Sequence, residues 1–290
     1  VRVELDVNWK FFCDNFNESY HTRFVHPQVP SVIDQDHFTS RYEMFPKGHA
    51  RIIQMGRPSL RDRVNEDEDH PFKMILESWG VDVNQYPDYE TLSQQGWTDL
   101  KKAKRKLYKE KGYHHYENLS DEELTESPFQ FIFPNIAMGV QADGCILLNW
   151  FPHPTDPEKC FFDLWDMGYP IGGSAKGIGK TGRESDNEFT STSAGIGKRD
   201  EDDVQEFVSR TKVNPVKLQE VELDHRDYDG GKGVEDLWDH VVYQDWQLTD
   251  GLRRGVRSKG YQEPYLAAQE TRVRYFHETL HDYLNGKSPK

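Results

Sequence analysis

The sequence contains little that would support disulfide bonds, cysteine-bound metals or a membrane span. Only three cysteines occur in 290 residues, Cys13, Cys145 and Cys160, and none belongs to a CxxC or CxH pair. Because apolar residues flank each cysteine, we expect buried thiols in a reducing compartment, the cytoplasm, rather than disulfides or ligands of zinc or iron–sulfur clusters. No apolar run approaches the roughly 20 residues that a membrane helix needs.

Positive charge is also scarce. The formal net charge is -14, from 36 Lys and Arg against 50 Asp and Glu. Nucleic acids and anionic membranes bind cationic surfaces, so this balance argues against both as partners. The N-terminus lacks the basic and then apolar pattern of a signal peptide. Because the sequence begins with Val1 and enters a strand-like segment at once, we expect a fragment of a longer polypeptide.

The residue pattern predicts a single domain of α+β class, with helices packed on one face of a curved antiparallel sheet. The turn signals ADG and HPTDPEK join three strand candidates, which should form an antiparallel meander. We expect strands at 1–9, 49–56, 129–141, 145–153 and 159–167, and helices at 12–26, 233–257 and 263–285. Pro27 should end the first helix, and Pro264 suits the first turn of the last.

Two segments stand apart from this sheet-and-helix pattern. Residues 60–128 are polar and predict a helical insertion, with a capping box at Ser120–Glu123. The insertion includes the basic run Lys101–Lys111, which we interpret as a solvated helix face or, alternatively, a docking patch for an acidic partner. Residues 168–203 are rich in Gly, Ser, Thr and charge and predict a flexible loop.

Two histidines stand near the end of the first predicted helix. Their spacing of five puts His21 and His26 about 140° apart on a regular helix. Because a residue before proline is pushed out of the helical region, His26 should leave that register and turn back toward His21. Glu18, three residues before His21, lies on the same face.

An acid interrupts the apolar stripe of the helix predicted over 233–257. The stripe runs through Val234, Trp238, Val241, Leu248 and Leu252, and Asp245 occupies its centre. A carboxylate on an apolar face is unfavourable by several kcal/mol unless a metal or a partner compensates it. A structural salt bridge is one explanation. The other is a metal held by two imidazoles and one carboxylate, the ligand set of non-haem Fe(II) oxygenases.

Several stretches resemble one family. NWKFFCDNFNESYHTRFVHP (8–27) resembles the catalytic-domain signature of Rieske-type ring-hydroxylating oxygenase alpha subunits, the naphthalene dioxygenase-like family. FIFPN (131–135), YQDWQLTDGLRRGVRS (243–258) and PYLAAQETRVRYFHETLHDYL (264–284) are similar to further segments of that family, in the same order. The resemblance implies a helix-grip (START/Bet v 1-like) fold.

For the active site, the resemblance implies that His21, His26 and Asp245 bind mononuclear Fe(II). Glu18 would be the electron-relay bridge from the Rieske [2Fe-2S] cluster of a neighbouring subunit, in a homotrimer. Electrons would come from NAD(P)H through a reductase and ferredoxin. O2 would hydroxylate an apolar, aromatic substrate in a dioxygenase, monooxygenase or demethylase reaction.

This sequence departs from the family pattern in three respects. The bridging acid is Glu18 where Asp is common, and Asp250 stands where Glu is commoner. No CxH…CxxH motif is present, so we expect the N-terminal Rieske domain to be absent from this chain.

Residues for a substrate cavity are harder to predict, because aromatic stripes usually belong to a core. The candidates are Asn15, Phe16, Phe24, Met138, Leu148 and Phe151.

Three other interpretations compete with the iron site. His277–His281 spells the HExxH zinc motif, yet a histidine packed beside Val273, Phe276, Leu280 and Leu284 is the simpler expectation. Residues 174–181 nearly match a phosphate loop but lack a preceding strand. A metal-free START-like carrier of an apolar small molecule would use the same cavity without iron.

Overall fold

The computed structural model describes residues 2–62, 70–168, 237–262 and 265–288. Its frame is a seven-stranded antiparallel sheet in the order β1-β7-β6-β5-β4-β3-β2. The strands are β1 (Arg2–Leu5), β2 (Arg41–Phe45), β3 (His49–Met55), β4 (Glu126–Ile132), β5 (Ile136–Gln141), β6 (Gly144–Pro152) and β7 (Cys160–Gly168). The helices are α1 (Lys10–Phe16), α2 (Thr22–Val25), α3 (Pro71–Ser78), α4 (Tyr89–Thr91), α5 (Trp97–Leu107), α7 (Leu237–Val256) and α8 (Thr271–Leu284). None of these helices is long and apolar enough to cross a membrane.

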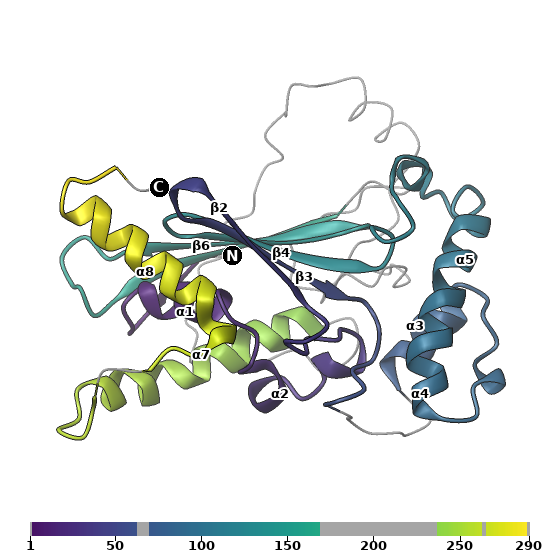
Figure 1. Ribbon diagram of the computed structural model, residues 1–290, viewed down its shortest axis with the longest axis horizontal. Helices are drawn as coiled ribbons and strands as arrows, with labels where there is room; N and C mark the ends of the chain where they lie inside the picture. The colour runs from purple at the N-terminus through teal and green to yellow at the C-terminus, as the bar shows by residue number, and fades with distance from the viewer. Residues whose placement is uncertain (1, 63–69, 169–236, 263–264, 289–290) are drawn as a thin grey trace.

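Side chains alternate between the two faces of the sheet, and one face carries the main core. On β6, Trp150 is fully buried while its neighbour Phe151 is 38% exposed. Trp150 pairs with Phe162 of β7, and Phe12 of α1 stacks on the Trp150 ring. Helices α1, α7 and α8 lie on the same side of the sheet (Figure 1). The predicted α+β architecture is therefore confirmed, with helices covering one face.

The segment 129–141 forms two strands, β4 and β5, and not the single strand expected. Phe133–Asn135 makes the turn between them, and register pairs Ile132 with Ile136. Pro134 has no N–H for a sheet ladder, which is why proline is disfavoured within a central strand. The side-chain amide of Asn135 donates to the Trp150 carbonyl at 2.7 Å and ties this turn to β6.

The first predicted helix is also divided. Helix α1 ends at Phe16, and α2 begins only at Thr22. At the break, the buried Asn17 side chain donates to the Cys13 carbonyl at 2.8 Å. Such local side-chain bonds to the backbone compete with helix continuation. His26 caps the end of α2 with φ -121° and ψ 66°, so the expectation that it leaves the helical register is confirmed.

The C-terminal helices differ from the prediction at their ends. On α7, Val241 and Asp245 are buried, but Leu248 and Leu252 are 39% and 45% exposed. The apolar face therefore turns toward Val242 and Trp246, which pack in the core. Helix α8 begins at Thr271, later than expected, and Pro264 lies outside the described residues. The Glu270 carboxylate accepts the Ala267 N–H at 2.7 Å just before the helix.

The segment between β3 and β4 contains α3, α4 and α5 around a second apolar cluster. The α5 surface is not a wholly solvated basic face, because Lys104 is only 1% exposed. Its ammonium donates to the Leu124 carbonyl at 2.8 Å and lies 5.5 Å from the Trp79 ring centroid. Burial lowers the Lys104 pKa, while Asp143 raises it. The buried lysine thus ties α5 to the hairpin carrying Asp143.

The capping box is confirmed, since the Glu123 carboxylate accepts the Ser120 N–H at 2.7 Å and Ser120 Oγ accepts the Glu123 N–H at 3.2 Å. The predicted flexible loop at 168–203 lies outside the described residues except for Gly168, the last residue of β7. The near-match to a phosphate loop at 174–181 lies wholly outside them.

The two tryptophans of β6 and β7 provide a matched test of this core. Trp150→Ala removes a fully buried ring, so the free energy of unfolding should fall by about 3–5 kcal/mol. Trp165→Ala removes a ring that is 39% exposed, and the loss should stay within about 1 kcal/mol. Urea unfolding followed by circular dichroism measures both. Equal losses would contradict the assignment of the core to one face.

Candidate metal centre

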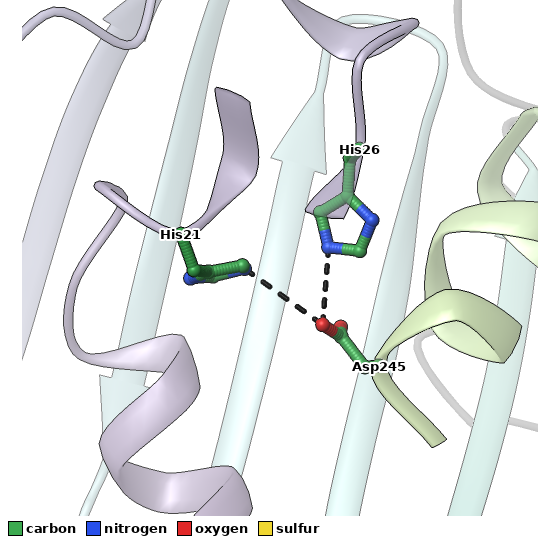
Figure 2. Close-up of side chains that lie close together, drawn as sticks. All are labelled: His21, His26 and Asp245. Atoms are coloured by element: carbon green, nitrogen blue, oxygen red, sulfur yellow. Dashed lines mark ion pairs between the residues drawn. The ribbon is translucent and has the colours of Figure 1, made fainter. Parts of the chain in front are cut away.

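Two imidazoles and one carboxylate from opposite ends of the sequence converge (Figure 2). His21 precedes α2 and His26 ends it, while Asp245 comes from the middle of α7. Asp245 Oδ1 lies 3.1 Å from His26 Nε2 and 3.8 Å from His21 Nε2. The three ligand atoms lie within 4.8 Å of one another. The structure therefore brings together the three residues singled out from the sequence.

Each imidazole is held through its other nitrogen. His21 Nδ1 lies 2.6 Å from the Glu18 carboxylate, and His26 Nδ1 lies 2.8 Å from the side-chain carbonyl of Gln244. Both partners are acceptors, so Nδ1 of each neutral ring carries the proton and Nε2 keeps a lone pair. Gln28 donates to the same Gln244 oxygen at 2.8 Å. Both Nε2 lone pairs consequently face Asp245.

This arrangement assembles acceptors without a donor. His26 Nε2 and both Asp245 oxygens are buried and have no hydrogen-bond partner among the described residues. An unpaired buried carboxylate is unfavourable by several kcal/mol, which a cation would offset. Two atoms that bind one transition metal at about 2.1 Å each would lie roughly 3 to 4 Å apart. The observed separations of 3.1 and 3.8 Å fit such an ion.

Glu18 controls the proton affinity of His21. Burial alone would lower the His21 pKa, but the hydrogen bond that His21 donates to Glu18 and the charges of Glu18 and Asp245 outweigh it and raise that pKa. A second Glu18 oxygen accepts the His21 backbone N–H at 3.2 Å, which fixes the carboxylate. Because a proton on His21 competes with a metal, metal affinity should fall as the pH falls.

A buried arginine accompanies Glu18, and the sequence analysis missed it. Arg272 of α8 is 1% exposed and donates to the Phe16 carbonyl at 3.4 Å. Burial lowers the Arg272 pKa to about 10, while Tyr42 and Glu18 raise it. An arginine on the apolar side of a helix, in register with Phe276, is the signal that could have identified it.

A cleft that is open to solvent adjoins the three ligands, with about 460 Å³ of atom-free space. Its floor comes from the sheet, where Ile52 of β3 pairs with Phe129 of β4. Gly139 of β5 lies opposite Phe129, and a Cβ at Gly139 would be 2.8 Å from the ring. Helix α7 contributes Val241 to the same cleft. The absence of a side chain at Gly139 thus leaves room for the Phe129 ring.

Of the six residues predicted for the cavity, Asn15 and Phe16 line this cleft. Phe24 is 72% exposed and Phe151 is also exposed, so both face solvent. Leu148 is buried in the main core, and Met138 of β5 does not line the cleft. Apolar character alone could not separate core from pocket.

Gln54 of β3, Gln35 and Gln244 went unrecognised in the sequence. Gln54 and Gln35 line the cleft, and Gln244 orients His26. A glutamine on the buried face of a strand, two residues after Ile52, was the available signal for Gln54.

The HExxH motif does not assemble a zinc site. His277 is not packed in the core, because its Nε2 lies 2.7 Å from the Asp14 carboxylate at 43% side-chain exposure. His281 Nε2 is 3.1 Å from the Asn285 amide nitrogen. Within the described residues, His21, His26 and Asp245 form the one group of three potential ligands close enough to share an ion.

Comparison with known proteins identifies the family. Residues 1–170 and 199–286 match the family described as the ring hydroxylating alpha subunit (catalytic domain). The chain therefore belongs to this family, and the helix-grip fold expected from the sequence is confirmed. No curated protein matched the chain in a sequence search.

Solved structures of similar fold include quaternary ammonium Rieske monooxygenases. CntA in complex with the inhibitor MMV12 is 13% identical, with a TM-score of 0.44, over 98% of this chain and 48% of that chain. A second structure is of a quaternary ammonium Rieske monooxygenase, described with insights into carnitine oxidation by gut microbiota and inter-subunit electron transfer. It is also 13% identical with a TM-score of 0.44, over 98% of this chain and 49% of that chain. CntA with gamma-butyrobetaine is 14% identical, with a TM-score of 0.40, over 98% and 47%. This chain spans about half the length of each.

His26 Nε2 and the Asp245 oxygens are hydrogen-bond acceptors without a donor among the described residues. This surplus of acceptors predicts an unusual response to Asp245→Asn. The amide nitrogen could donate to His26 Nε2, now 3.1 Å from a carboxylate oxygen, and the buried charge would disappear. Without metal, the variant should therefore unfold at the same temperature as wild type or a higher one. With Co²⁺ added, only wild type should gain stability. Differential scanning calorimetry measures both, and a marked loss of metal-free stability would contradict the surplus of acceptors.

Proposed function

We propose that this chain is the catalytic domain of a Rieske-type non-haem iron oxygenase, in which His21, His26 and Asp245 bind one Fe(II). The observation that carries the proposal is the buried Asp245 carboxylate, which faces two imidazole lone pairs and no donor among the described residues. When bound, Fe(II) held by two histidines and one carboxylate supplies open coordination positions for O2 activation. Membership of the family supports iron rather than another divalent metal.

The chain's own residues orient the ligands and shield one side of the site. Glu18 and Gln244 hold the two rings by their Nδ1 protons, which directs both Nε2 atoms to the same point. Asp245 and His26 are 4% and 2% exposed, so water has little access behind them. The cleft lies on the side where Phe16, Ile52 and Phe129 provide apolar contact. We infer that an aromatic substrate occupies this cleft beside the metal.

We also propose that Glu18 links the site to its electron supply. Its carboxylate already accepts two N–H groups of His21, yet it is 9% exposed and retains further acceptor capacity. A cluster-bound histidine from another subunit could donate to it, in a homotrimer that receives electrons from NAD(P)H through a reductase and ferredoxin. The three free cysteines suit a reducing cytoplasm. Hydroxylation with one or both oxygen atoms of O2, or demethylation, would use the same residues.

Iron analysis of three variants tests the metal assignment. Wild type loaded anaerobically with Fe(II) should retain about one iron per chain, and His21→Ala and Asp245→Ala should retain almost none. His281→Ala is the matched control, because it removes the last histidine of HETLH and should retain iron fully. Iron that is retained in Asp245→Ala would contradict the proposed site. A wild type without stoichiometric iron, which still binds apolar ligands, would instead indicate a metal-free carrier.

Glu18→Gln separates metal binding from electron supply. The amide can still accept one N–H of His21 but loses the charge, so iron content should remain near that of wild type. NADH-driven product formation, measured with a Rieske protein, ferredoxin and reductase supplied, should fall about 10- to 100-fold. Asp14→Asn is the control, because Asp14 makes a comparable acid–histidine contact with His277 outside the site. Full activity of Glu18→Gln would contradict the proposed relay.

A further inference from the structure

The cleft beside the proposed iron site is not uniformly apolar. Its lining includes the side-chain amides of Asn15, Gln35 and Gln54 as well as the rings of Phe16 and Phe129. Gln54 is 2% exposed although it lies within β3, and Ile52 on the same face of that strand forms the floor. Carboxamides this deeply buried usually have hydrogen-bond partners.

In two of these amides, one polar atom lacks a hydrogen-bond partner. Asn15 Nδ2, a donor, and Gln35 Oε1, an acceptor, are buried without a hydrogen bond to any described residue. Gln35 Nε2 donates to Gln54 Oε1 at 3.3 Å, which fixes the orientation of the Gln35 amide and leaves its oxygen available. The residues that line the cleft therefore include one donor and one acceptor without a partner. Leaving such groups unmatched weakens binding of any ligand that cannot pair with them.

The charges around the cleft narrow the range of possible ligands further. Among the described residues that line it, no lysine or arginine is present to pair with an anionic group. The two lining acids, Glu18 and Asp245, already contact the histidines. A neutral polar group that accepts from Asn15 and donates to Gln35 is the chemistry that remains.

We propose that the cleft binds an aromatic ligand that carries a neutral carboxamide-like group. The ring packs against Phe16 and Phe129, the ligand carbonyl accepts from Asn15 Nδ2, and the ligand N–H donates to Gln35 Oε1. The proposal rests on the proposed function only in taking the cleft as the substrate site. It replaces the expectation of a wholly apolar substrate with that of an aryl amide or a close isostere.

Three ligands of similar size separate the two hydrogen bonds. Benzamide offers an acceptor and a donor, acetophenone an acceptor only, and ethylbenzene neither. Isothermal titration calorimetry on the metal-free protein gives their dissociation constants without need of turnover.

The two variants should affect these ligands differently. Gln35→Leu should weaken benzamide binding about fivefold or more and leave acetophenone and ethylbenzene within about twofold. Asn15→Leu should weaken benzamide and acetophenone alike but not ethylbenzene.

A matched control and isosteric variants guard against general disruption. Gln141 of β5 also has a buried unpaired Oε1 but does not line the cleft, so Gln141→Leu should change none of the three affinities. Thermal unfolding checks each variant. If a leucine variant does not fold, Asn15→Asp, which replaces the amide donor with an acceptor, and Gln35→Met serve in its place with the same expected pattern.

The outcomes separate this proposal from the oxygenase assignment. An equal loss of affinity for all three ligands in either variant overturns the proposed ligand class. So does the absence of measurable benzamide binding to wild type. Iron analysis on the same variants tests the metal site independently, because neither Asn15 nor Gln35 is one of its proposed ligands. Retained iron with an altered ligand pattern supports both proposals, whereas the expected ligand pattern without iron overturns only the oxygenase.

Discussion

The structure depends on one buried carboxylate. Asp245 lies on the core side of α7, 4% exposed, and two imidazole nitrogens point toward it without providing a donor. The rest of the site can be understood as the means of keeping these groups together. Glu18 and Gln244 fix the rings, the break after α1 and the early end of α2 bring both rings to the same side, and the sheet floor carries the cleft.

The sequence was sufficient to single out the three proposed metal ligands because their chemistry conflicts with their surroundings. An acid at the centre of an apolar stripe and a histidine before proline each violate a local rule, and such violations concentrate at functional sites. The α+β class followed from strand alternation and turn signals. The resemblance to ring-hydroxylating oxygenases added the pairing of Glu18 with His21, which the structure contains at 2.6 Å.

The errors have identifiable physical origins. A single helix was expected over 12–26, whereas the Asn17 side chain bonds to the Cys13 carbonyl and the helix stops. Leu248 seemed to continue a buried stripe, but the apolar face of α7 turns toward Trp246. Lys104 was counted among solvated cations, yet aromatic rings and a backbone carbonyl enclose it. For Leu248 and Lys104, tertiary contacts overrode a local pattern.

The pocket was the least predictable part. Phe24 and Phe16 look alike in sequence, but only Phe16 lines the cleft. Which aromatic side chains face a cavity depends on register between strands, such as Ile52 opposite Phe129, and on a single glycine at position 139. None of these relations is visible in a single segment. They exist only once the sheet has formed.

The origin of the ligands also bears on how the fold is held. His21 and His26 belong to the first tenth of the chain and Asp245 to the last sixth. An ion shared by them is thus a cross-link between the two ends, comparable in topology to a disulfide that closes a long loop. A free ion concentration of a thousand times the dissociation constant would add about 4 kcal/mol to the free energy of unfolding. The same three side chains would then serve both as a reaction centre and as a cross-link that stabilises the domain.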